Sequence, residues 1–260
     1  MNAEKTTVEL HSRKEDGVLW LTIDRQERRN AMSPNVIAGL TEAMERARTD
    51  RELRAIVVSG AGDKAFCAGA DLQTGTSFKF DYSEPQHAFA NLLRTAKAAR
   101  VPLIARVNGA CMAGGMGLLA MCDLAIAAPH ARFGLPEVKI GVFPAQVLSV
   151  LQGLLGRRAL TQMCITGESV DAPTALAYGL VNEVSTDLDG AVQALLARIL
   201  DKSPAAVRRG LYVMKHVEHM TFEQSVAFTE GQISLFALSE DAAEGQLAFR
   251  ERRQPQWSGR

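Results

Sequence analysis

The sequence predicts an α/β protein in which a β/α core is followed by a helical C-terminal region. Over roughly the first 145 residues, short apolar runs closed by glycine or polar residues alternate with segments of helical periodicity. That alternation is typical of a mainly parallel sheet covered by helices. Beyond that point almost every periodic segment has helical spacing. The 260 residues, 47% of them hydrophobic, suffice for a large buried core.

The N-terminal half predicts strands and helices in alternation. Residues 6–11 and 17–23 are expected to form two strands that are joined by a turn containing Asp16–Gly17. Ser33–Pro34 predicts a helix start, because proline suits the first helical position and apolar residues then recur at helical spacing. The remaining elements predicted in this half are a strand at 54–60, a helix at 86–99, a strand at 103–107, a short helix opened by a glycine-rich segment, and a strand at 123–128.

The C-terminal half predicts mostly helices. Residues 180–184 predict one more strand, and Ser203 followed by proline predicts a helix start. Residues 221–253 predict two helices, with Ser239 capping the second. We therefore divide the chain into a core, residues 1–195, and a helical region, residues 196–260. Residues 74–85 predict a loop that is unusually rich in aromatic side chains.

Composition excludes several classes of function. Lys+Arg and Asp+Glu both number 29, so the chain has no overall basic field for nucleic acid. No apolar run approaches the roughly 18–20 residues that span a membrane. The cysteines lack CxxC spacing and lie in apolar surroundings, as buried reduced thiols of a cytoplasmic protein do. His216 and His219 have no partner pattern for a metal, so no metal site is expected.

The segment ACMAGGMGLLAMCD, residues 110–123, places three glycines at a predicted strand-to-helix junction. One interpretation is a dinucleotide fingerprint, because GMGLLA matches GxGxxA and Glu137 lies near the distance of a ribose-binding acid. A better one is an oxyanion hole, because glycines let backbone N–H groups point into a cavity beside a helix N-terminus. FCAGAD, residues 66–71, is a second small-residue turn after a strand and could supply the other donor.

Four segments together carry a resemblance to a known family. They are FCAGADL, RVNGACMAGGMGLLAMCDLAIAA, FGLPEVKIGVFP and ITGESVDAPTALAYGLVNEV, and the end of the chain, SEDAAEGQLAFRERRQPQW, is similar as well. In this order they resemble the crotonase (enoyl-CoA hydratase/isomerase) superfamily. The resemblance implies a spiral of ββα units with a helical C-terminal trimerisation region that covers the active site. It also implies a homo-oligomer, either a trimer or a dimer of trimers, and acyl-CoA substrates. Coenzyme A then enters as part of the substrate, with no tightly bound cofactor.

The resemblance also assigns catalytic roles. It places the thioester oxygen between the backbone N–H groups of Ala70 and Gly114, and it makes Glu137 the general base and then the general acid. Family hydratases carry a second glutamate at the position of Gly117, so one of two expected carboxylates is missing here. The GAGG-like turn of the family is also replaced, by residues 145–148.

Coenzyme A contacts are implied in three places. The loop DRQERRNAM, residues 24–32, matches the family loop that contacts the pantetheine and the phosphates. FCAGADLQ is expected to line the CoA groove through its backbone, and the C-terminal helix of a neighbouring subunit is expected to contribute an adenine-stacking and a 3′-phosphate position. The residues concerned are Arg25, Arg28, Arg29, Ala31, Ala68, Asp71, Leu72, Phe249 and Arg252.

The expected function is hydration of a 2-enoyl-CoA to a 3-hydroxyacyl-CoA through a thioester enolate held in the oxyanion hole. The glycine at position 117 favours an alternative, a Δ3,Δ2-enoyl-CoA isomerase that shuttles one proton with the single glutamate Glu137. A catalytically weak paralogue that binds acyl-CoA as an assembly or regulatory subunit is an alternative from another class.

Overall fold

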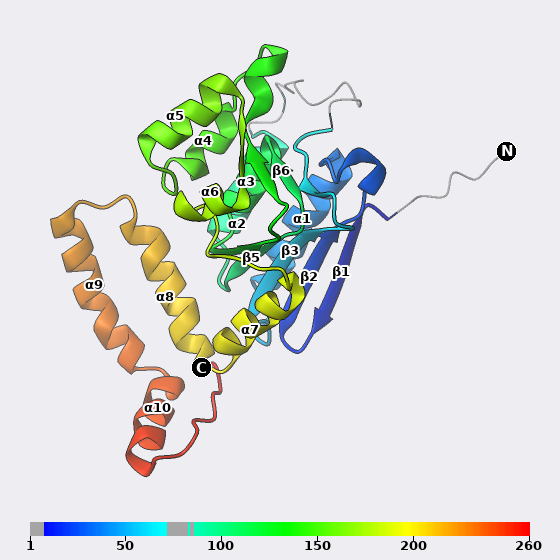
Figure 1. Cartoon of the computed structure of the whole chain (residues 1–260). Helices are drawn as coiled ribbons and strands as arrows, with labels where there is room; N and C mark the ends of the chain where they lie inside the picture. The colour runs from blue at the N-terminus through cyan, green and yellow to red at the C-terminus, as the bar shows by residue number, and fades with distance from the viewer. Residues whose placement is uncertain (1–7, 72–82, 84–85) are drawn as a thin grey trace.

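The computed structural model of the chain describes residues 8–71, 83 and 86–260. Its larger sheet has the strand order β1-β2-β3-β5-β7-β10, in which β1 is antiparallel to β2 and the other neighbours are parallel (Figure 1). The strands of this sheet are β1 (Leu10–Glu15), β2 (Val18–Ile23), β3 (Ala55–Gly60), β5 (Leu103–Val107), β7 (Leu124–Ala127) and β10 (Glu183–Val184). The prediction of a mainly parallel sheet is confirmed.

A second, smaller sheet runs beside the first in the order β4-β6-β8-β9. Its strands are β4 (Ala65–Cys67), β6 (Ala110–Met112), β8 (Arg132–Gly134) and β9 (Ser169–Asp171). Three times in succession, a strand of the large sheet is followed by a strand of the small sheet and then by a helix. This repeat is the spiral of ββα units that the sequence resemblance implied.

Helices cover both faces of the large sheet. The side chains of one strand alternate between two apolar clusters, so that Leu21 and Ile56 face the main core whereas Val18 and Val57 face a smaller one. The helices are α1 (Pro34–Ala47), α2 (Ala88–Lys97), α3 (Gly114–Ala120), α4 (Ala145–Leu151), α5 (Arg157–Thr166), α6 (Ala172–Ala177), α7 (Leu188–Leu200), α8 (Pro204–Val217), α9 (Phe222–Ala237) and α10 (Glu240–Glu251), with short 3-10 helices η1 (Gln26–Arg28) and η3 (Pro136–Ile140). Helices α1 and α2 contribute to the main core, and α7 contributes to the smaller cluster.

The helix starts predicted at Ser33, Ser203 and Ser239 are confirmed, because each serine side chain caps its helix. The first strand was predicted wrongly as residues 6–11. Asp16 and Gly17 both have positive φ, which makes a two-residue hairpin turn, and this turn fixes β1 directly before it at Leu10–Glu15. The polar sequence of β1 lacks the apolar pattern by which strands are predicted, because an edge strand that faces water need not be apolar.

The C-terminal helices α9 and α10 stand apart from the β/α body, and α8 connects them to it (Figure 1). Helix α8 is tied to the body by the ion pairs Lys215–Asp123 and Lys97–Glu218. Among the described residues, no helix is both long and apolar enough to cross a membrane.

Candidate active site

The loop after β4 is held against the loop before α1 by a single parallel bridge between Met32 and Ala70. Met32 donates its N–H to Gly69 O at 2.8 Å, and its carbonyl accepts from Asp71 N at 3.0 Å. Both residues that flank Ala70 are therefore fixed by hydrogen bonds. The Ala70 N–H points away from Met32 and donates to no acceptor among the described residues.

Gly114 opens α3 directly after β6, so its N–H has no partner within the helix. A Cβ built at Gly114 would lie 3.6 Å from Ala70 N, which brings the two predicted donors to one place. The neighbouring Gly115 is required by packing, since its Cβ would lie 2.2 Å from the Cys67 carbonyl oxygen. Ala113 has φ 51° and ψ −122°, which is strained for a residue with a side chain and aims the chain into the helix.

Glu137 lies on η3, three residues after Gly134, whose carbonyl accepts the Ala113 N–H at 2.9 Å. This pairing brings the glutamate to the end of the small sheet from which α3 begins. Its Oε2 is buried and has no hydrogen-bond partner within the described part of the chain. Burial raises the pKa of Glu137 above the ordinary value for glutamate. A raised pKa makes it easier for a carboxylate to take up a proton, which suits a group that takes up a proton and then returns it.

Cys164 on α5 is a neighbour of Glu137 that the sequence analysis missed. Burial, and then the Glu137 carboxylate, raise the pKa of its thiol. Burial likewise raises the pKa of Cys67 to about 12. All four cysteines are buried and free, as predicted, and they remain thiols rather than nucleophiles.

Gly117 lies on α3, one turn after Gly114, and is surrounded by apolar side chains. A Cβ at this position would lie 2.8 Å from Val147 Cγ1 and 2.9 Å from Phe89 Cζ. Val147 comes from α4, within the segment that replaces the family's GAGG-like turn. The space that a second carboxylate would need is therefore filled.

The residues predicted to contact coenzyme A fall into two groups. Arg28, Arg29 and Ala31 lie on the loop before α1, and Arg29 O accepts the Ala68 N–H at 3.1 Å, so this loop lies beside the turn at 68–71. Phe249 on α10 is 85% exposed, and Arg252 is exposed at the end of the same helix. Figure 1 shows α10 far from α3, so a single chain does not bring the two groups together.

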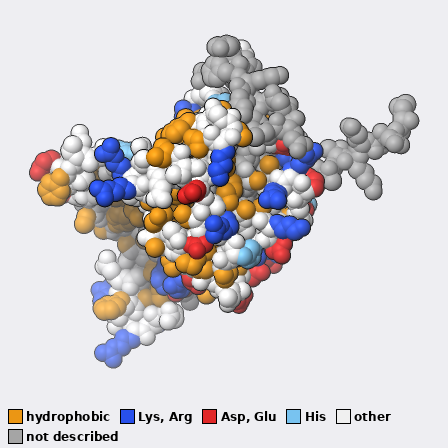
Figure 2. All heavy atoms as spheres, turned by 45° about the horizontal axis from the view of Figure 1, so that its top comes forward, with side chains coloured by type: hydrophobic (Ala, Val, Ile, Leu, Met, Phe, Trp, Pro, Cys, Tyr) orange, Lys and Arg blue, Asp and Glu red, His pale blue; other side chains and the backbone are white. Residues whose placement is uncertain are grey.

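The remaining predictions concern Asp71, Leu72 and the loop at 74–85. The Asp71 carboxylate is buried and ion-paired with Arg25, so both side chains are engaged within the protein. Leu72 and most of the loop predicted at 74–85 lie outside the described residues. Ile140 and Phe143, which follow Glu137 in the chain, have exposed apolar side chains. On the face shown in Figure 2, basic and acidic side chains are interspersed among apolar ones.

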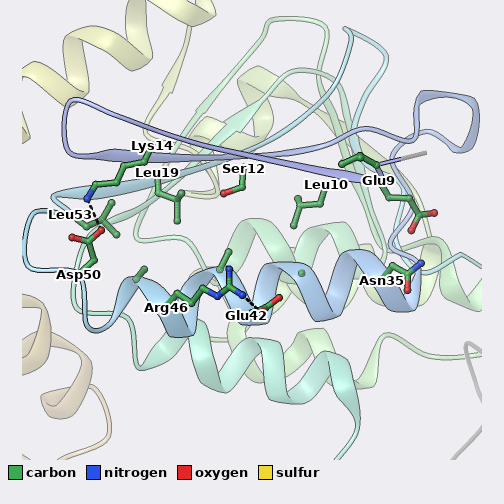
Figure 3. A pocket seen from close by; sticks show the side chains of 14 residues that line it. Glu9, Leu10, Ser12, Lys14, Leu19, Asn35, Glu42, Arg46, Asp50 and Leu53 are labelled. Atoms are coloured by element: carbon green, nitrogen blue, oxygen red, sulfur yellow. Dashed lines mark hydrogen bonds and ion pairs between the residues drawn. The ribbon is translucent and has the colours of Figure 1, made fainter. Parts of the chain in front are cut away.

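A surface groove lies on another part of the β/α body. It has a volume of about 450 Å³ and runs between β1 and α1 (Figure 3). Its charged side chains are already paired, Lys14 with Asp50 and Arg46 with Glu42. None of Ala70, Gly114 and Glu137 lines this groove, so the candidate site is distinct from it.

Two turn amides that converge near a carboxyl group with one buried oxygen are an arrangement that can stabilise an oxyanion. Comparison with known proteins identifies the family. The sequence profile of the family described as "Enoyl-CoA hydratase/isomerase" matches residues 13–260, and the chain belongs to this family.

Characterised relatives and solved structures agree with this assignment. The chain is 32% identical to (E)-benzylidenesuccinyl-CoA hydratase of Thauera aromatica, over 93% of this chain and 96% of the relative. It is 31% identical to 2,3-dehydroadipyl-CoA hydratase of Escherichia coli strain K12, over 97% and 99% of the two chains. The crystal structure of an enoyl-CoA hydratase of Mycobacterium smegmatis superposes with a TM-score of 0.88 at 33% identity, over 96% of this chain and 99% of that one. The expected crotonase-like fold and enzyme class are confirmed.

Proposed function

We propose that the protein adds water across the double bond of a 2-enoyl-CoA to give a 3-hydroxyacyl-CoA. The observation that carries this proposal is the convergence of the Ala70 and Gly114 amides, neither of which has an acceptor among the described residues. Such a pair stabilises charge that develops on a thioester oxygen, and one donor of this kind is worth about 2.7–4 kcal/mol. The names of the relatives above, which are CoA hydratases, support the same reaction.

In the proposed reaction, Glu137 first acts as a carboxylate base. It takes a proton from water while the water oxygen bonds to C3, and the electrons of the C2–C3 double bond move to the thioester oxygen. The two amides hold the resulting enolate. Glu137 then returns the proton to C2, and the thioester carbonyl re-forms. The elements of one water are added, and the step needs neither a metal nor a redox cofactor.

A second candidate function is Δ3,Δ2-enoyl-CoA isomerisation. The observation that favours it is the apolar packing around Gly117, which leaves Glu137 without a second carboxylate. In this reaction Glu137 takes a proton from C2 of a 3-enoyl-CoA and returns it to C4, so that the double bond moves into conjugation. The enolate intermediate, and the two amides that hold it, are the same.

The coenzyme A portion is proposed to lie along the turn at 68–71, with the exposed Arg28 and Arg29 near its phosphates. Arginine suits this role because its donors form a fork that matches phosphate. Phe249 and Arg252 would complete the adenine site from a neighbouring subunit. The buried free cysteines support a reducing compartment, and we place the protein in the cytoplasm.

A homotrimer or a dimer of trimers is proposed as the assembly, with region 196–260 covering a neighbour's site. The support is the set of large apolar side chains that a single chain leaves exposed on α9 and just after it. These residues are Phe222, Ile233, Leu235 and Leu238. Sedimentation equilibrium tests the proposal, and a monomer at micromolar concentration would contradict it.

Incubation of the protein with trans-2-hexenoyl-CoA in D2O, followed by mass spectrometry, tests the reaction. A product that has gained the elements of water and retains one deuterium on carbon supports hydration. Deuterium incorporation with a shifted double bond and no added water supports the isomerase. Binding of the thioester without any change favours the catalytically weak paralogue and contradicts both reactions.

A further inference from the structure

Arg25 binds three separate segments of the chain through its guanidinium group. Its Nε lies 2.7 Å from Glu9 Oε1, its Nη1 donates to the Ala31 carbonyl at 2.6 Å, and its Nη2 donates to Asp71 Oδ2 at 2.7 Å. The side chain is only 11% exposed, and that of Asp71 is 7% exposed. Glu9 lies at one end of the groove in Figure 3 and also accepts from Ser33 Oγ at 2.6 Å.

These contacts enclose the bridge that carries the proposed oxyanion donor. Ala31 directly precedes Met32, and Asp71 directly follows Ala70, so Arg25 holds one residue on each side of the Met32–Ala70 bridge. The backbone hydrogen bonds of Met32 to Gly69 and Asp71 hold the same two segments together. Arg25 therefore helps to fix the direction of the Ala70 N–H, because it holds the residue after Ala70 and the residue before its bridge partner Met32.

We propose that Arg25 is a positioning residue that aims the Ala70 N–H at the substrate oxygen, acting through Asp71 and Ala31. This inference rests on the proposed oxyanion hole. It also replaces the role in phosphate binding that the sequence suggested for Arg25. A guanidinium with each nitrogen engaged by a protein oxygen, and with little exposed surface, does not suit phosphate binding, whereas Arg28 and Arg29 are exposed on the same loop.

The geometry explains why arginine is required at this position. Three contacts in three directions need a planar group with several donors, and lysine has a single nitrogen. Loss of the Asp71 contact alone removes one restraint on the residue next to Ala70, whereas loss of the Ala31 contact removes a restraint on the opposite side of the bridge. A displaced donor weakens the bond to the developing oxyanion more than it weakens the binding of the CoA portion, which contacts other residues.

The test compares the variants R25Q, R25K and D71N with the parent enzyme. We expect R25Q to lower kcat on a 2-enoyl-CoA by about tenfold or more, with KM within about threefold, since a full oxyanion donor is worth about 10²–10³ in kcat. R25K and D71N should lie between R25Q and the parent. The infrared carbonyl stretch of the bound thioester should shift to higher frequency in the variants, because a weaker hydrogen bond polarises the carbonyl less.

Arg54→Lys is the matched control. Arg54 is also partly buried and donates to the carbonyls of Leu200 and Lys202, but it lies at the opposite end of β3 from the site. A lysine there should lower the melting temperature and leave kcat within about twofold. A merely structural Arg25 would behave in the same way as this control.

Each outcome decides the inference. If folded R25Q keeps the parent kcat and the parent carbonyl frequency, the inference is wrong. Where R25Q does not fold, the same result for folded R25K and D71N shows that the inference is wrong. If the parent itself shows no turnover, the proposed function fails, but the carbonyl shift of the bound thioester still tests Arg25. A parent that induces no carbonyl shift overturns the inference together with the oxyanion hole.

Discussion

Gly117 and Val147 are so close that a Cβ at residue 117 would lie 2.8 Å from Val147 Cγ1. Phe89 closes the same space from α2, at 2.9 Å. Val147 and Phe89 are only 3% and 6% exposed, so neither can turn outward into solvent. The glycine and the two apolar side chains therefore form one packed unit. Apolar contacts occupy the space in which a second carboxylate would lie. Insertion of a carboxylate at residue 117 alone cannot create a two-carboxylate site.

The first prediction concerns this packed unit. Gly117→Ala should destabilise the protein by about 1–3 kcal/mol, because the added methyl group overpacks a buried contact. Val147→Ala in the same chain should recover part of the loss. Gly210→Ala is the control, since a Cβ there meets no atom within 4 Å and alanine is the better helix former. Urea denaturation measures all of these variants, and a Gly117→Ala protein as stable as the parent would show that the packing is loose.

The second prediction is that Glu137→Gln abolishes most of the turnover. The amide keeps the size of the side chain but cannot accept and return a proton, and loss of a general acid–base group costs about 10²–10⁴-fold in rate. Binding of coenzyme A, measured by calorimetry, should stay within a few-fold of the parent. Unchanged turnover would remove Glu137 from the mechanism.

The third prediction follows from the pKa of Glu137. Burial raises that pKa in the folded protein, so folding favours the protonated form. The stability that this proton provides is complete below the ordinary glutamate pKa and is lost as the pH rises through the raised folded value. Glu137→Gln should therefore melt at a higher temperature than the parent at pH 7, and the difference should shrink in acid. Melting curves between pH 4 and pH 8 give the answer, and a variant that is less stable at pH 7 would contradict the assigned burial effect.

The fourth prediction distinguishes loss of the Gly114 N–H donor from crowding by a side chain at residue 114. Gly114→Pro should lower kcat by about 10²–10³, because proline removes one donor while its missing N–H is tolerated at the first position of a helix. Gly114→Ala keeps the donor. Its Cβ would lie 3.0 Å from the flexible end of Met32 and at ordinary contact distances, 3.5 and 3.6 Å, from Gly69 Cα and Ala70 N. It should retain most of the activity. Equal losses in the two variants would point to crowding rather than to the donor.

The sequence was sufficient for the apolar inner strands of the large sheet but not for its edge strand β1 or for the small sheet. Strands such as β3 and β5 are apolar runs of five or six residues, buried on both faces, and these are recognisable by composition alone. The strands of the small sheet have three residues each and are set between glycines and small side chains. Three residues do not establish a period, so this sheet was not predicted from periodicity.

The site was predictable where a motif carries it and not where tertiary contacts do. Glycine spacing after a strand indicates the two turns, and the family resemblance assigns Ala70 and Gly114 within them. The role of Arg25 does not, because its partners Glu9 and Asp71 are distant in sequence and arginines in a loop usually contact water. The filling of the space beside Gly117 by Phe89 and Val147 likewise depends on helices that meet only in the folded chain.

The fifth prediction concerns Asp241, which joins α8, α10 and the C-terminal residues. Its carboxylate is 1% exposed and accepts hydrogen bonds from Ser203 Oγ at 2.7 Å, Ala205 N at 3.1 Å, Ser258 N at 2.8 Å and Gly259 N at 2.9 Å. Burial by itself would raise the pKa of Asp241, but these hydrogen bonds outweigh it and hold the pKa below the usual value.

Asp241→Asn should destabilise the protein at pH 7, because the amide turns one NH2 group toward N–H donors and leaves them unsatisfied. The stability that Asp241 provides is present above the ordinary aspartate pKa and is lost as the pH falls through the lowered folded value. The difference between parent and variant should therefore be largest near pH 7 and should diminish below about pH 4. Asp201→Asn is the control, since that side chain is exposed and pairs only with its neighbour Lys202 within the described chain. Denaturant unfolding at pH 7 and pH 3 measures the effect, and a gap that widens in acid would contradict the role assigned to the Asp241 carboxylate.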